Sequence, residues 1–160
     1  MMNTSRMPLL LASVLMAAQA AAGTSFRLEI GPAVADTSAG KVKNAVLLVR
    51  PLLCGDPASV RITATAEGIV NGARQSVPLK LVALPTPGVH AVQRQWPDGQ
   101  WVIHLSGTCP QPKAGASTIV PLTGTGTDTR FSRPKTQVLR EPATKAQVEA
   151  ALAEVARGDS

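Results

Sequence analysis

The sequence predicts an all-β protein: an antiparallel immunoglobulin-like or transthyretin-like β-sandwich with one disulfide and a C-terminal α-helix. Three observations support this prediction. Seven short runs of alternating or β-branched apolar residues are separated by proline, glycine and asparagine turn signals. The chain has only two cysteines, Cys54 and Cys109. Near the end, the spacing of apolar residues changes from the alternation of strands to the period of an amphipathic helix.

Residues 1–22 have the pattern of a secretory signal peptide. A basic residue, Arg6, precedes an apolar run over residues 8–18, and small residues continue to Ala22. This run is too short to span a bilayer as a helix, and no later run is long enough. We therefore expect a Sec-type signal peptide that is removed, and a periplasmic or secreted bacterial protein that is not membrane-spanning. The alternative is a buried N-terminal helix.

The predicted sandwich domain covers residues 23–127. Its first strand alternates apolar and polar side chains from Phe26 to Ile30 and stops at Gly31–Pro32. Pro51 is expected to end or bend a later strand, and Asn71–Gly72 is a strong signal for a tight turn. Further strands are expected over residues 41–50, 60–67, 77–83 and 117–122.

Residues 89–109 predict a β-hairpin around which the fold is organised. Two strand-like runs flank Pro97-Asp98-Gly99, which is typical of a tight turn. With Asp98 and Gly99 at the tip, Trp96 lies opposite Trp101 and Arg94 opposite Ile103. Strand alternation then places one apolar set on a common face, expected to be the centre of the core: Val92, Trp96, Trp101, Ile103 and Leu105.

Cys54 and Cys109 are expected to form one disulfide, because both lie in the exported part of the chain. Their Cα atoms should lie about 4.4–6.8 Å apart, and closing so long a loop would stabilise the fold by roughly 4 kcal/mol. A catalytic or metal-binding thiol pair would need C-x-x-C spacing or adjacent histidines. A true immunoglobulin domain has a tryptophan soon after its first cysteine, whereas both tryptophans here lie just before the second.

Residues 128–160 are expected to be a basic linker and an amphipathic helix from about Lys145 to Ala156. Thr144 can cap the helix, Gln147 completes a capping box, and Gly158 is placed to end it. The apolar stripe is narrow: Val148, Ala151, Leu152 and Val155. We therefore expect the helix to dock marginally and to face a partner, and the sandwich to fold without it.

Four runs of the chain have a further pattern in common with a known group of domains: residues 62–72, 77–84, 88–92 and 99–103. They resemble the small exported transthyretin-like and FixH/YtkA-like sandwich domains, in which Gly-x-Tyr-x-Val … Gly-x-Trp-x-Leu marks a hairpin. His90 stands where that pattern has tyrosine. The resemblance implies a secreted module for binding or assembly rather than catalysis. Some of these domains act near copper sites, but this chain lacks the residues that would bind copper.

No catalytic residue, metal site or cofactor is predicted. His90 and His104 fall on opposite faces of the expected hairpin, and all four methionines lie in the signal peptide. The chain has no Gly-x-Ser-x-Gly motif. The acidic residues are scattered over turns and strand exteriors, where turn chemistry and solubility explain them: Glu29, Asp36, Asp56, Glu67, Asp98 and Asp128.

One ligand patch is a candidate, formed by Arg94, Trp96 and Trp101. An arginine on an apolar face can stack on an indole, and such a patch could bind a sugar. The alternative is plain core packing, because the chain has so few aromatic residues that its core needs both tryptophans.

The formal net charge is +6, or +5 once Arg6 leaves with the signal peptide. The densest basic stretch contains Arg130, Arg133, Lys135 and Arg140. We expect it to be a solvated linker. The alternative is a contact with anionic lipid headgroups or polysaccharide. No aromatic residues interleave it, so nucleic acid is not expected as a partner.

We therefore expect an exported, non-enzymatic β-sandwich that acts as a binding or assembly module in the bacterial cell envelope. Its expected partner is another envelope protein or an anionic envelope polymer. The alternative is a small secreted hydrolase or carbohydrate-active enzyme.

Overall fold

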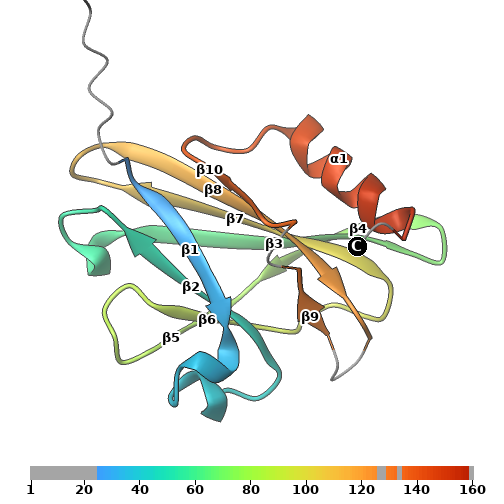
Figure 1. Cartoon of the computed structure of the whole chain (residues 1–160), viewed down its shortest axis with the longest axis horizontal. Coiled ribbons are helices and arrows are strands. Elements are labelled where there is room, and N and C mark those ends of the chain that lie inside the picture. The colour runs from blue at the N-terminus through green and yellow to red at the C-terminus, as the bar shows by residue number, and fades with distance from the viewer. Residues whose placement is uncertain (1–24, 126–128, 133–134, 159–160) are drawn as a thin grey trace, which may run out of the picture.

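The computed structural model describes residues 25–125, 129–132 and 135–158, which form a sandwich of two antiparallel sheets and one α-helix (Figure 1). This confirms the fold class predicted from the sequence. The expected signal peptide, residues 1–22, lies outside the described residues. Within the described ranges, no helix is both long and apolar enough to cross a membrane.

The smaller sheet has four strands: β1 (Arg27–Pro32), β2 (Ala45–Leu52), β5 (Leu81–Ala83) and β6 (His90–Gln93). Their order is β1-β2-β6-β5. Pro51 lies within β2 rather than ending it. It faces Leu28 of β1, whereas the pairing of β2 with β6 stops at Val49, so no strand lies opposite the missing N–H.

The larger sheet has six strands: β3 (Arg61–Val70), β4 (Ala73–Leu79), β7 (Gln100–Cys109), β8 (Ala114–Thr123), β9 (Arg130–Phe131) and β10 (Gln137–Leu139). The order is β10-β8-β7-β3-β4, and β9 also pairs with β8. Asn71 and Gly72 form the predicted turn between β3 and β4, with φ angles of 49° and 79°.

The single strand predicted over residues 77–83 is divided between the two sheets. Leu79 pairs with β3, whereas Leu81 pairs with β6. The chain crosses at Lys80, whose N–H donates to the Gln95 side chain (3.0 Å) and whose C=O accepts from it (2.9 Å). A side-chain amide thus satisfies the backbone groups that leave the ladder.

The hairpin predicted over residues 89–109 is wrong, because β6 and β7 lie in different sheets. β6 pairs with β2 and β5, and β7 pairs with β3 and β8. Both edges of each strand are therefore occupied, and Pro97–Gly99 belongs to a crossover between the sheets. This crossover lets Trp96 and Trp101 pack against each other inside the sandwich, with ring centroids 6.4 Å apart.

The residues predicted to form the core are nevertheless buried between the sheets: Val92, Trp96, Trp101, Ile103 and Leu105. Gly68 of β3 lies opposite Trp101 of β7. A Cβ atom added at Gly68 would come within 2.3 Å of the indole. The ring packs this close to the neighbouring strand only because that residue is glycine.

The helix α1 (Lys145–Ala156) forms a third layer on the outer face of the larger sheet (Figure 1). The predicted capping box is confirmed: Thr144 Oγ1 accepts from the Gln147 N–H, and the Gln147 side chain accepts from the Thr144 N–H. The predicted apolar stripe is buried against Val102 and Ile119. In this structure the sheet therefore covers the stripe, and the expectation that the helix is only marginally docked and faces a partner stays a prediction.

The segment expected to be a basic linker contributes β9 and β10. β9 pairs with Leu122–Thr123 and β10 with Ser117–Ile119, along the edge of β8 that β7 leaves open. The buried Ser117 hydroxyl also donates to the Glu141 C=O (2.5 Å) and accepts from the Ala143 N–H (2.6 Å). These bonds fix the approach of the chain to α1.

Candidate functional site

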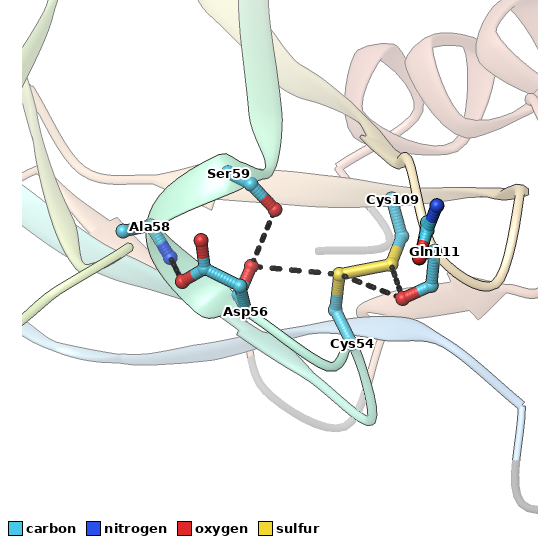
Figure 2. The surroundings of a disulfide bond; sticks show 6 residues. All are labelled: Cys54, Asp56, Ala58, Ser59, Cys109 and Gln111. Carbon is cyan, nitrogen blue, oxygen red and sulfur yellow. Dashed lines mark hydrogen bonds between the residues drawn. A yellow bond between two sulfur atoms is a disulfide. The ribbon is translucent and has the colours of Figure 1, made fainter.

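The predicted disulfide is present. The Cα atoms of Cys54 and Cys109 lie 5.8 Å apart, and the residues are 55 positions apart in the sequence. The bridge joins the loop after β2 to the end of β7, so it ties the two sheets together (Figure 2). The Gln111 carbonyl oxygen lies 3.3 Å from the Cys109 Sγ and 3.9 Å from the Cys54 Sγ. This bridge has a structural role.

The candidate ligand patch comes together at the crossover between the sheets. The indoles of Trp96 and Trp101 are only 5% and 2% exposed. Arg94 donates to the Asp98 carboxylate at 2.5 Å. The hollow beside these residues has a volume of about 10 Å³, the space of roughly one water molecule. It has no room for a sugar ring.

The two histidines lie in different sheets. His90 belongs to β6, and its Nδ1 is 3.0 Å from the carbonyl oxygen of Gly88. His104 belongs to β7, and its Nε2 is buried without a hydrogen-bond partner among the described residues. The two imidazoles therefore cannot bind one metal ion together.

A groove lies beside His104, between the larger sheet and the first turns of α1. Its volume is about 530 Å³, which falls in the range of small-molecule sites, about 300–1,000 Å³. We call it the α1 groove. Its lining residues come from three strands and from the helix with its approach: Glu67, Arg74, Gln75, Ser76, His104, Ala143, Lys145, Val148 and Glu149.

Charged and polar groups link the two sides of the α1 groove. The turn between β3 and β4 places Ser76 directly opposite Glu67, and the Ser76 hydroxyl donates to Glu67 Oε1 at 2.9 Å. Arg74 Nη2 contacts both Glu67 (3.1 Å) and Glu149 of α1 (2.8 Å). The guanidinium thus joins a carboxylate of the sheet to a carboxylate of the helix.

His104 differs from these groups because its Nε2 atom has no hydrogen-bond partner among the described residues. Burial lowers the pKa of His104 below its ordinary value of 6.5, and the negative charge of Glu67 opposes this shift. The imidazole is therefore neutral at pH 7, with one nitrogen able to donate and the other to accept. Of the described side chains that line the groove, His104 has the one buried polar atom without a hydrogen bond.

The α1 groove contains the residue types of a hydrolytic triad in a different order. In such a triad the serine donates to histidine, and the histidine to a carboxylate. Here the Ser76 hydroxyl donates directly to the Glu67 carboxylate. The serine proton therefore points to a carboxylate, which is a much weaker base than imidazole.

No local sequence pattern predicts this groove as a whole. Glu67 has a place in it beyond the turn chemistry and solubility expected of it, and nothing in the sequence singles out Arg74, Ser76 or Glu149. One part of the groove can be predicted from the sequence. Counting outward from the Asn71–Gly72 turn along the two strands pairs Glu67 with Ser76. The position of Glu149 depends on how a distant helix docks, and no local pattern encodes that.

Comparisons of the chain with protein-family models, with curated proteins and with solved structures find no match.

Proposed function

We propose that this protein is an exported, non-enzymatic binding module of the bacterial cell envelope, and that its α1 groove holds a small polar ligand. One observation carries the proposal. The groove has the size of a ligand site, Arg74 pairs with both of its carboxylates, and His104 Nε2 has no hydrogen-bond partner among the described residues. The disulfide and the resemblance to exported sandwich domains support the proposed location.

The charges of the groove favour a neutral or zwitterionic ligand. Glu67 and Glu149 balance Arg74 and Lys145, so the lining has no net formal charge and does not attract anions over a distance. The imidazole of His104 lines the groove, and the Ser76 oxygen, whose proton is donated to Glu67, can accept a hydrogen bond from a ligand. Amino acids, short peptides and sugars have the matching chemistry.

A small secreted hydrolase is the second candidate, and one observation favours it. Convergent polar groups and a lowered histidine pKa within one groove are features of active sites. The contact between Ser76 and Glu67 argues for binding instead, because the hydroxyl is not held by a general base.

A binding screen separates the two candidates. The mature chain is mixed with amino acids, dipeptides, monosaccharides and esters, and ligand-observed NMR records both binding and turnover. We expect at least one compound to bind unchanged, to lose binding in His104→Gln, and to keep it in the control His90→Gln. Equal binding by all three proteins would contradict the assignment of the groove. Product formation that stops in Ser76→Ala would instead establish the hydrolase.

A further inference from the structure

A second hollow lies between β1, an edge strand of the smaller sheet, and β10, at the end of the larger sheet away from β4. Its volume is about 260 Å³. We call it the edge cleft. β1 contributes one wall, and Phe131 of β9, Thr136, and Val138 of β10 contribute the other. The β1 residues are Arg27, Leu28, Glu29 and Ile30.

The edge cleft exposes apolar side chains that point toward the sandwich interior. Val138 lies opposite Thr118, which is fully buried, so the two share the inner face of the sheet. Val138 is nevertheless 49% exposed. Phe131 lies opposite Leu122 of the core on the same face. The sandwich is therefore open along this side, with an apolar floor.

β1 presents an open backbone edge to the edge cleft. Among the described strands β1 pairs only with β2. The Leu28 carbonyl accepts from Thr118 Oγ1 at 3.2 Å, so this carbonyl points away from β2. Residues two apart on an antiparallel strand direct their N–H and C=O groups to the same side, so those of Ile30 also point away from β2. The Leu28 carbonyl already has Thr118 as its partner, so the N–H and C=O of Ile30 are the groups that would pair with an added strand.

The surroundings of the edge cleft are basic. Glu29 of its lining forms an ion pair with Arg50. The exposed side chains on and beside the cleft strands then include four cations, Arg27, Arg130, Lys135 and Arg140, and one further acid, Glu141. A partner segment that carries carboxylates complements this charge.

We propose that the edge cleft binds an acidic, extended segment of a partner protein, which adds a strand to β1 and places an apolar side chain against Val138 and Phe131. A peptide fits better than an anionic polysaccharide, because only a peptide backbone offers alternating donors and acceptors to the edge of β1. This surface is separate from the α1 groove and does not depend on the ligand proposed there.

The test uses a ten-residue peptide of alternating valine and glutamate, and a second peptide with lysine in place of glutamate. Binding to the mature chain is measured by calorimetry, and amide hydrogen exchange is followed at Ile30. We expect the acidic peptide to bind, the basic peptide to bind at least about tenfold more weakly, and the Ile30 amide to become protected. Val138→Asp should weaken binding by about tenfold or more. Val34→Asp is the matched control, because Val34 is 89% exposed and lies outside the cleft.

Several results would overturn this proposal. The acidic peptide fails to bind, the two peptides bind equally, or the Ile30 amide stays unprotected in the complex. Binding of polygalacturonate without binding of the acidic peptide would assign the cleft to a polysaccharide. Self-association in the ultracentrifuge that Val138→Asp abolishes would assign it to a second copy of the chain.

Discussion

Single residues decide how closely β3 and β7 pack in the larger sheet. The indole of Trp101 occupies the space that a side chain at Gly68 would need. The nearby Trp101 Nε1 is buried without a hydrogen-bond partner in the described part of the chain. Packing rather than hydrogen bonding therefore fixes the position of this ring.

Gly68→Ala is expected to lower the free energy of unfolding by about 1–3 kcal/mol or more, because the fully buried ring has nowhere to move. Gly31→Ala is the control, since a Cβ atom there meets nothing within 4 Å, and its effect should stay within about 0.5 kcal/mol. Urea unfolding measures both. Equal unfolding midpoints for the two variants would show that the indole adapts.

His104 makes stability depend on pH. Its pKa is lowered in the folded state, so between that value and 6.5 the unfolded chain binds more protons than the folded chain. Stability contributed by this residue is present above pH 6.5 and is lost as pH falls through the folded pKa. Urea unfolding should therefore show that the free energy of unfolding falls from pH 7.5 to pH 5.5, and that it falls less in His104→Gln. An identical pH profile in the variant would assign the decline to other groups.

At the scale of elements, local signals predicted which segments form strands and helices, but not their partners. The capping box at Thr144 and the turn at Asn71–Gly72 are correct because each depends on residues within one or two turns. The hairpin at Pro97–Gly99 failed because a tight-turn sequence does not specify whether the chain returns along one sheet or crosses to the other. β9 and β10 were missed because two or three residues carry no periodicity.

Local sequence signals likewise predict only part of the α1 groove. The pairing of Glu67 with Ser76 follows from one local turn, but the α1 groove also requires the helix to dock on the sheet. The expectation that the sandwich folds without α1 stays a prediction. The burial of Leu152 and of Val102 beneath it gives the helix a place in a second apolar cluster.

Leu152→Ala tests how firmly α1 is docked. Leu152 is 2% exposed, so its truncation should cost about 2–5 kcal/mol. Leu53→Ala is the control, because Leu53 is 44% exposed and should change the free energy of unfolding by about 0.5 kcal/mol or less. Urea unfolding again provides the measurement. A negligible effect at Leu152 would support the prediction of a marginally docked, partner-facing helix.

At the scale of the whole molecule, three layers follow one another: the smaller sheet, the larger sheet and α1. One apolar cluster fills each interface, and the disulfide crosses the first of them. The structure contains this bridge, so a thiol reagent should find no free cysteine in the unreduced, unfolded chain. Reduction should then lower the free energy of unfolding by about 4 kcal/mol, from loop-closure entropy. Two free thiols in exported protein would contradict this assignment.

We expect a small polar ligand to bind in the α1 groove, and chemical-shift mapping of a bound compound tests this. The mature chain is labelled with ¹⁵N and titrated with the strongest hit of the binding screen. The largest amide shifts should occur at Glu67, Ser76, His104 and Lys145, with Ile30 and Val138 of the edge cleft unchanged. Shifts confined to residues outside the groove would contradict this expectation.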